Sequence, residues 1–379
     1  MEKQLQLKKI GCSNCGAELI FDPGTQMTNC NFCGSQFQIE KAQDGEIVMP
    51  DGILPFKISK QQYADSVLAW LSEGDYTPDD ILKSTVFESV NGVYLPMWLY
   101  KGRYHGNWSA SSGYKRREEY SEWSESQKKM VRKTRTVTDW RPSSGQCSGE
   151  FTILAFAGAG NGIKPDIAIY AHGTSFSRGE MKPFDSKYTL GFSIVDFTID
   201  EHSTWDTLGR IQADSQVESD AKQRIPGDKY KDFYCDVLYD KEQPLRVYVP
   251  FWITYYKYND KEFHVYMDGT STSRIRGTRP EDQGRKDTIK KLKLKIITIG
   301  ILGSIGLSFV VGLISCLIQK GRFKINMIDN DKFYVPGLIA FVFIIIATFI
   351  FQKYKTNEIL TKSKLKRQEI LKNLQENKE

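Results

Sequence analysis

The sequence predicts an α+β protein with a zinc ribbon at its N-terminus and a two-helix membrane hairpin near its C-terminus. Two Cys-X-X-Cys pairs lie within the first 40 residues. Aromatic strands and amphipathic helices then alternate, and two long uncharged segments follow. We divide the chain into ribbon, linker, body, first span, second span and basic helical tail, which cover residues 1–40, 41–52, 53–280, 296–318, 333–351 and 352–379.

The first element carries four cysteines at metal-ligand spacing, Cys12, Cys15, Cys30 and Cys33. Two residues separate the cysteines of each pair, so one tight turn can aim both thiolates at the same ion. Four sulfur ligands close a tetrahedral shell and leave no position open for a substrate, so we expect one structural Zn²⁺ ion. A redox dithiol is the alternative, but it would need only one pair.

The body contains an internal repeat. Residues 93–98 read Val-Tyr-Leu-Pro-Met-Trp and residues 247–252 read Val-Tyr-Val-Pro-Phe-Trp, so four of six positions are identical. Both segments read as strands, and because proline cannot donate to a ladder, each proline marks an edge, a bulge or a strand start. We interpret the repeat as two duplicated halves, each with a helix before its strand; chance similarity is the alternative.

Each repeated strand follows an amphipathic helix, expected over about 59–73 and 203–224. Ser59 and Gln62 have the spacing of a capping box at the start of the first helix. The positions expected to face inward are Tyr63, Val67, Trp70 and Leu71 in the first helix and Leu208, Ile211 and Val217 in the second.

The stretch between the repeats, residues 111–146, has few core residues, and its later part alternates as an exposed hairpin does. Basic residues interleaved with aromatic ones can bind single-stranded nucleic acid. Glu118, Glu119, Glu122 and Glu125 oppose that reading, so we favour a solvated hairpin. The ribbon also lacks a basic face, because residues 1–40 hold three lysines and four acidic residues. Nucleic acid is therefore not an expected partner.

The two uncharged segments contain 23 and 19 residues, enough to cross a hydrocarbon core of about 30 Å as helices. The short connection between them makes them antiparallel neighbours. Small residues recur at every fourth position of the first span, at Gly300, Ser304, Ser308, Gly312 and Cys316. Such a ridge lets another helix approach closely, either the second span or a second copy in a homo-oligomer.

Charge predicts that both termini lie in the cytoplasm. From residue 274 onward the chain has 21 Lys and Arg against 9 Asp and Glu, whereas the preceding part is net acidic. Six basic residues precede the first span and six follow the second, while aspartates offset the basic residues of the connecting loop. Reduced cysteines need the same side. We therefore expect a multi-pass protein of a bacterial inner membrane, with the lipid bilayer as a partner.

The order of these motifs resembles that of a known family. The ribbon is followed by Leu-Pro-Phe-Lys-Ile at 54–58, the two repeated strands, Tyr-Met-Asp-Gly at 266–269 and a membrane segment. This set is similar to bacterial membrane-anchored TFIIB-type zinc-ribbon proteins, often mislabelled as helicase PriA-related. The resemblance covers most of residues 11–320, but relatives often have two cysteine quartets, and this chain adds a second span and a charged tail.

The resemblance implies a cytoplasm-facing membrane anchor without known catalysis, associated with membrane-stress proteins of the flotillin-like and phage-shock types. The residues themselves give no catalytic constellation, since the four histidines lack a nucleophile or second ligand at a recognisable spacing. The glycine-rich residues 158–162 lack the lysine of a phosphate loop. We therefore expect a membrane-anchored adaptor or scaffold that is not an enzyme; the alternative is a membrane-tethered nucleic-acid-binding regulator.

Overall fold

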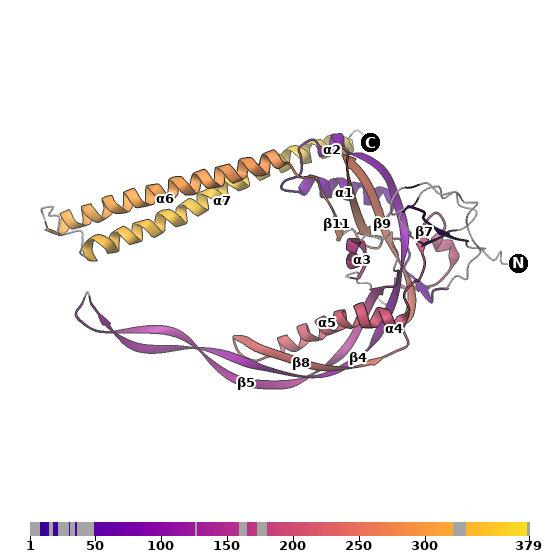
Figure 1. Ribbon diagram of the computed structural model, residues 1–379, viewed down its shortest axis with the longest axis horizontal. Helices are drawn as coiled ribbons and strands as arrows, with labels where there is room; N and C mark the ends of the chain where they lie inside the picture. The colour runs from indigo at the N-terminus through magenta and orange to yellow at the C-terminus, as the bar shows by residue number, and fades with distance from the viewer. Residues whose placement is uncertain are drawn as a thin grey trace. The chain divides into compact units, whose positions relative to one another are not determined.

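The computed structural model describes residues 8–14, 18–21, 30, 35, 49–125, 127–158, 165–172, 180–320 and 331–376 (Figure 1). These residues form two compact units. Unit 1 comprises Met1–Val67, Val86–Glu122 and Arg132–Thr278, and unit 2 comprises Leu68–Thr85, Trp123–Val131 and Arg279–Glu379. The class is α+β, as predicted, with one mixed sheet and two apolar C-terminal helices.

The sheet is organised around two central strands, β4 and β9. Its strands are β1 (Lys8–Gly11), β2 (Glu18–Phe21), β3 (Gly52–Ile53), β4 (Val86–Ser124), β5 (Lys129–Phe156), β6 (Lys182–Pro183), β7 (Ser193–Val195), β8 (Lys229–Lys241), β9 (Leu245–Tyr258), β10 (Lys261–Asp268) and β11 (Ile275–Gly277). Their order is β1-β2-β7-β4-β9-β10-β11, and β3 adds to β9 while β5 and β8 add to β4. Only β3 with β9 and β7 with β4 are parallel among the pairings with a defined register.

The helices divide between the sheet and the C-terminal hairpin. They are α1 (Lys60–Glu73), α2 (Ile81–Ser84), α3 (Pro165–His172), the 3-10 turn η3 (Ser186–Thr189), α4 (Glu201–Thr204), the π-helical turn η4 (Trp205–Gly209), α5 (Arg210–Gln223), α6 (Gln283–Lys320) and α7 (Asp331–Glu376).

The two repeated motifs pair with each other at the centre of the sheet. Leu95 lies opposite Val249, and these two residues hold the same place in their motifs. On either side Tyr94 faces Pro250 and Pro96 faces Tyr248, so each tyrosine meets the proline of the other copy. The register is therefore symmetric about the Leu95–Val249 pair, as in an interface between two identical strands.

Each proline lies where the outer neighbour of its strand changes. β3 pairs with β9 up to Tyr248, and β10 begins its pairing at Phe251, so Pro250 lies between the two partners. On β4, the β7 pairing ends at Tyr94 and the carbonyl of Pro96 accepts a hydrogen bond from Ala157. Both strands are internal, so neither proline marks an edge strand or a strand start. Each proline instead lies between two outer neighbours of its strand, where its missing N–H costs no ladder hydrogen bond.

The surrounding hydrogen bonds repeat the same symmetry. The indole nitrogen of Trp98 donates to the carbonyl of Ile199 at 3.0 Å, and that of Trp252 donates to the carbonyl of Ile58 at 2.9 Å. Both carbonyls stand just before the N-cap of a helix. Equivalent backbone bonds run from Ala157 to Pro96, from Gly269 to Pro250, from Ile199 to Ala157 and from Ile58 to Gly269.

The helices pack against the opposite strands from those expected. The sequence suggested that each helix belongs with the repeated strand that follows it in the chain. In the structure Tyr63 of α1 stacks on Trp252 of β9 and donates to the carbonyl of Val265. Trp205, in the second helix, packs against Tyr100 of β4. The two halves are intertwined, because each helix crosses to the strand of the other copy.

The capping box is confirmed: Gln62 N–H donates to the Ser59 hydroxyl at 3.2 Å, and Ser59 N–H donates to the Gln62 side chain at 2.9 Å. The buried face of α1 is also close to the prediction, with Tyr63, Val67 and Leu71 at most 1% exposed.

In the second helix Val217 is buried as expected, but Ile211 is 63% exposed and Leu208 only partly buried. The π-turn η4 adds a residue to one turn and rotates the following face. Trp205, Ala213, Val217 and Ala221 therefore form the buried stripe.

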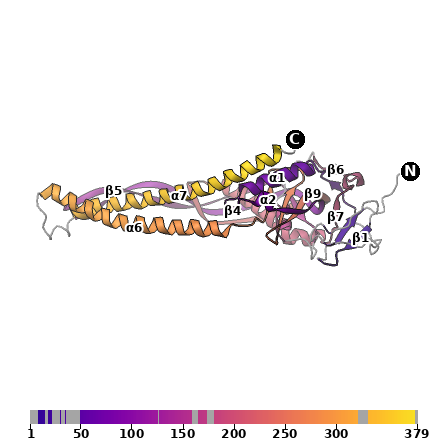
Figure 2. The same cartoon turned by 90° about the horizontal axis from the view of Figure 1, so that it is seen from above.

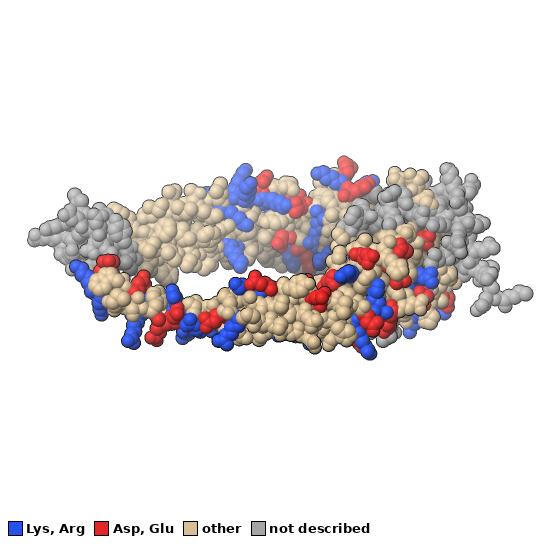
Figure 3. Space-filling view, turned by 60° about the horizontal axis from the view of Figure 1, so that its bottom comes forward, with Lys and Arg blue, Asp and Glu red and all other residues tan. Residues whose placement is uncertain are grey.

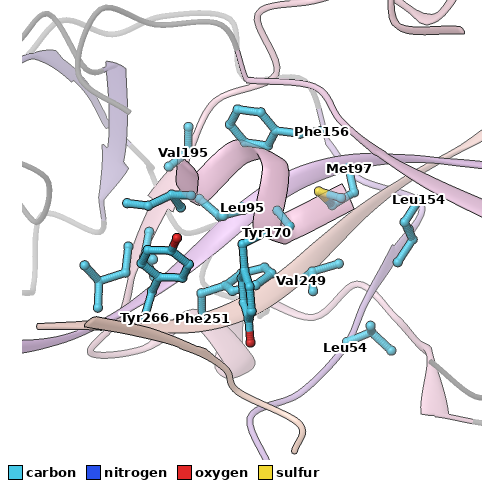
Figure 4. Packing of buried hydrophobic residues seen from close by; sticks show 14 of the residues in the cluster. Leu54, Leu95, Met97, Leu154, Phe156, Tyr170, Val195, Val249, Phe251 and Tyr266 are labelled. Atoms are coloured by element: carbon cyan, nitrogen blue, oxygen red, sulfur yellow. The ribbon is translucent and has the colours of Figure 1, made fainter. Parts of the chain in front are cut away.

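Hydrophobic cores lie on the faces of the sheet, and one of them contains Tyr94 and Tyr248 of the two repeated strands. A second core packs alternate residues of both strands against α3, with Leu95, Val249 and Phe251 at its centre (Figure 4). A third core packs the inner face of β4, β5 and β8 against the η4–α5 helix. It brings together Cys147 and Cys235, which the sequence left isolated, with sulfurs 3.9 Å apart.

In unit 2, α6 and α7 lie side by side over much of their length (Figures 1 and 2). Both are long and apolar enough to cross a membrane, judged over Gln283–Ile314 and Gly337–Glu376. The small-residue ridge faces α7: a β-carbon on Gly300 would lie 2.3 Å from Thr348, and Ser304 is fully buried. The ridge thus packs within the chain over these residues.

We expect Trp98→Phe and Trp252→Phe to destabilise unit 1 by similar amounts, about 1–3 kcal/mol each, because each removes a hydrogen-bond donor to a carbonyl beside a helix start. Chemical denaturation of the full chain in micelles, followed by near-ultraviolet circular dichroism, measures the effect. Trp123→Phe, at a tryptophan 52% exposed, is the control and should change little. A loss confined to one of the two variants would contradict the equivalence of the two sites.

Candidate functional site

The N-terminal turns place two of the predicted zinc ligands in one buried cluster. Cys12 follows β1 and is 4% exposed, and Cys30 is 1% exposed. Ser35 connects them, since the Cys30 N–H donates to its carbonyl at 2.7 Å and its hydroxyl lies 3.8 Å from the Cys12 sulfur. Cys15 and Cys33 lie outside the described residues.

The cysteine turns are attached to the body through a strand. β1 and β2 form an antiparallel hairpin with Ile10 opposite Leu19. β2 then pairs with β7, with Leu19 opposite Val195 and Ile20 opposite Ile194. Leu19 and Ile20 are fully buried on opposite faces of the sheet. The N-terminal hairpin is thus part of the body sheet.

The donor chemistry of this site suits zinc. The two buried sulfur atoms, one from each Cys-X-X-Cys pair, are ligands of the kind that a four-cysteine zinc site uses. Within the part of the chain that the structure describes, which includes Cys12 and Cys30 but not Cys15 or Cys33, no three His, Cys, Asp or Glu side chains gather as a metal site. If four thiolates converge, the ion would hold the turns closed and carry no reaction.

A second site, which the sequence did not reveal, lies where the tail of α7 meets the end of α1. Arg367 is fully buried. Its guanidinium donates to the carbonyls of Ser72 at 2.9 Å, Thr77 at 2.8 Å and Gly74 at 2.6 Å. These carbonyls belong to the last turn of α1 and the loop after it, so Arg367 caps the negative end of that helix.

Asp79 is the acidic centre of the same cluster. Arg285, near the start of α6, donates to it at 2.5 Å, and Ser363 of α7 donates to the same carboxylate oxygen. Lys366 lies 3.5 Å from the other oxygen. One carboxylate therefore joins α6, α7 and the loop before α2, and we call Asp79, Arg285, Ser363 and Arg367 the clasp.

Electrostatics favour the charged form of Asp79. Burial raises the pKa of its carboxyl, but the hydrogen bond from Ser363 and the charges of Arg285 and Lys366 outweigh burial, so the pKa is lowered. A lowered pKa stabilises the fold above the unfolded value, and this contribution is lost as the pH falls through the folded value. The clasp should therefore hold at neutral pH and weaken only in acid, below about pH 4.

The pattern of α7 hides the clasp from sequence reasoning. The apolar residues of the tail predict contact with a membrane or a partner helix. In the structure Leu365 is 59% exposed. The buried positions are Thr356, Ser363 and Arg367, which are all polar. Hydrophobic periodicity cannot identify such a face; the only signal is one basic residue four positions after a serine.

Other candidate groups are scattered. His264 is buried beside the Thr278 hydroxyl, whereas His105 and His202 are exposed on β4 and α4. Burial, followed by the neighbouring Cys147, raises the pKa of the Cys235 thiol to about 12, which disfavours a reactive thiolate. A polar pocket of about 260 Å³ beside Lys101, Arg103 and Glu150 is open to solvent.

Comparison with known proteins gives one informative similarity. The uncharacterized protein YdjG of Bacillus subtilis (strain 168) is 22% identical over 137 residues, which cover 24% of this chain and 40% of YdjG. The match therefore spans less than half of that relative. No family model matches the chain, and no solved structure matches it. The chain is thus similar to YdjG in part, and the wider zinc-ribbon family remains a prediction.

We expect Arg367→Ala to weaken the local stability of unit 2 by about 3–5 kcal/mol, because it leaves Asp79 and three carbonyls with fewer partners in a buried setting. Hydrogen exchange of amides 70–80 in the micelle-embedded chain should accelerate by roughly a hundredfold or more. Lys366→Ala removes the same charge from the neighbouring residue, whose side chain is 62% exposed, and should have little effect. Equal effects of the two substitutions would refute a specific clasp.

Proposed function

We propose that the protein is a membrane-anchored adaptor that faces the cytoplasm and presents its β-rich body to protein partners. The clasp carries this proposal. Asp79 and Arg367 join the start of α6 and the tail of α7 to the last turn of α1 and the loop after it, and unit 2 contains both the apolar hairpin and the end of that helix. An anchor that only tethered the body would not need a fully buried arginine at this point.

The membrane is proposed from α6 and α7. Their apolar residues are exposed, as with Leu302, Ile305, Phe343 and Ile350, each at least 57% exposed. Contiguous exposed apolar surface of this size needs a hydrophobic solvent. Since both helices return to one clasp, the start of α6 and the end of α7 lie on the same side, which we propose to be the cytoplasmic face of a bacterial inner membrane.

An adaptor is favoured over a nucleic-acid reader by the charges of the β4–β5 hairpin. Arg116 pairs with Asp139 at 2.7 Å, Arg135 with Glu118 at 2.8 Å and Lys133 with Glu122 at 2.7 Å. Acidic and basic side chains alternate along this hairpin (Figure 3). A phosphate-tracking surface would keep such cations unpaired.

The zinc ion is proposed as a structural part of this adaptor, held by Cys12, Cys15, Cys30 and Cys33. We expect one zinc per chain in metal analysis of the purified protein. Cys12→Ser should lower that ratio and expose the β7 edge, seen as faster hydrogen exchange at Ile194 and Val195, because β2 depends on the turns beside it. Cys316→Ser, a change at a cysteine outside the quartet, is the control. A zinc-free chain with a protected β7 edge would exclude this role.

We expect the chain to resist alkaline carbonate extraction from membranes. After mild solubilisation, repeated pull-downs of the chain should recover the same protein partner. Flotillin-like and phage-shock-type proteins are the partners to look for first. Arg367→Ala should retain the chain in the membrane and reduce recovery of the partner, because the anchor persists while its link to α1 weakens. The adaptor role fails if no protein is recovered reproducibly.

A further inference from the structure

The β4–β5 hairpin extends well beyond the three-stranded part of the sheet. β8 pairs with β4 from Gly102 to Gly113, and β4 continues to Ser124 without it. These 11 further residues extend about 36 Å at strand rise. We call residues 123–131 the tip and the paired strands before it the stalk.

Cross-strand ion pairs hold three of the stalk's cations, whereas the tip lysines form no such pair. These pairs join Arg116 to Asp139, Arg135 to Glu118 and Lys133 to Glu122. Lys128 and Lys129 of the tip are exposed, and neither has an acidic partner within the described part of the chain. Glu125 is the one acidic residue among residues 123–131. The tip therefore presents two exposed lysines against one acidic residue.

Two large apolar side chains stand beside these lysines. Trp123 is 52% exposed and Met130 is 58% exposed. The turn between them is ordered by a hydrogen bond from the Gln127 N–H to the Ser124 carbonyl, and Lys128 adopts a left-handed backbone with φ of 49°. The tip thus carries an indole, a thioether and two ammonium groups, and both apolar side chains are more than half exposed.

We propose that the tip binds the surface of a bilayer rich in anionic lipid. Tryptophan favours the boundary between headgroups and acyl chains, and lysines near it are attracted to acidic headgroups. The combination of exposed apolar and unpaired basic groups fits such a boundary better than water or a neutral protein surface. This inference rests on the proposed membrane anchoring, and it gives the hairpin a membrane contact in addition to that of α6 and α7.

The test uses the full chain in nanodiscs of phosphatidylcholine alone, so that the tip has no anionic surface of its own to occupy. Flotation with separate vesicles containing phosphatidylglycerol then reports binding. Each lysine at an anionic surface contributes about fivefold to binding, so Lys128→Gln with Lys129→Gln should weaken it roughly 25-fold. Trp123→Ser with Met130→Ser should also weaken it, by several-fold.

Two control variants distinguish binding by the tip from a general effect of lost positive charge or lost apolar surface. Lys290→Gln with Lys291→Gln removes the same charge beside the first span, and Tyr234→Ser with Leu238→Ser removes exposed apolar groups from β8, at 66% and 75% exposure. Both should bind anionic vesicles within about twofold of the unsubstituted chain. Equal weakening by the Lys290–Lys291 pair would overturn the assignment to the tip.

Other outcomes also decide the matter. Equal binding to vesicles of phosphatidylcholine alone would overturn the anionic preference, and so would binding that the tip substitutions leave unchanged. If a single-stranded oligonucleotide binds the tip and displaces the vesicles, the surface belongs to nucleic acid and the proposal fails. Carbonate extraction of the unsubstituted chain tests the anchor by itself, since the tip variants should stay as firmly inserted as the unsubstituted protein.

Discussion

The antiparallel ladder between β4 and β9 is the interaction on which the rest of unit 1 depends. It runs from Val86 opposite Lys257 to Leu99 opposite Leu245, with one irregularity between Phe87 and Ser89. Residues alternate across it, so that Leu95 and Val249 enter one core while Tyr94 and Tyr248 enter another. A slip of one residue would exchange these two sets between the faces and separate each tyrosine from the facing proline. The repeated sequence therefore specifies this register of the ladder.

Symmetry about this ladder explains why distant segments meet. A strand before α1 adds in parallel to β9, and a strand before α4 adds in parallel to β4, at corresponding residues. The tryptophans of the repeat then hold the carbonyls that precede each helix. Because each helix crosses to the strand of the other copy, neither half contains its own complete core. The body should therefore fold as one unit, with many contacts between residues far apart in the chain.

Sequence reasoning succeeded where the information is local. A capping box involves two residues three apart, and the face of α1 follows from spacing within one helix. The long apolar segments and the exposed hairpin are equally local patterns. Sequence reasoning failed where a helix must be assigned to a strand, because periodicity shows that α5 has a buried face but not which strand covers that face. The π-turn also shifts the buried face from Ile211 to Ala213. Arg367 was missed because a buried cation and a solvated one look alike in sequence.

The two equivalent outer strands, β3 and β7, are covered differently, and this difference explains the role of the N-terminal hairpin. β3 is covered on its outer side by the two residues of β6, which include Pro183 and cannot extend a ladder far. β7, at the equivalent position, is fully buried and would present a bare hydrophobic edge without β2. An exposed edge of this kind invites pairing with another chain. A hairpin of two four-residue strands is too small to be stable alone. A metal ion bound at Cys12 and Cys30 would therefore stabilise the hairpin that covers the β7 edge.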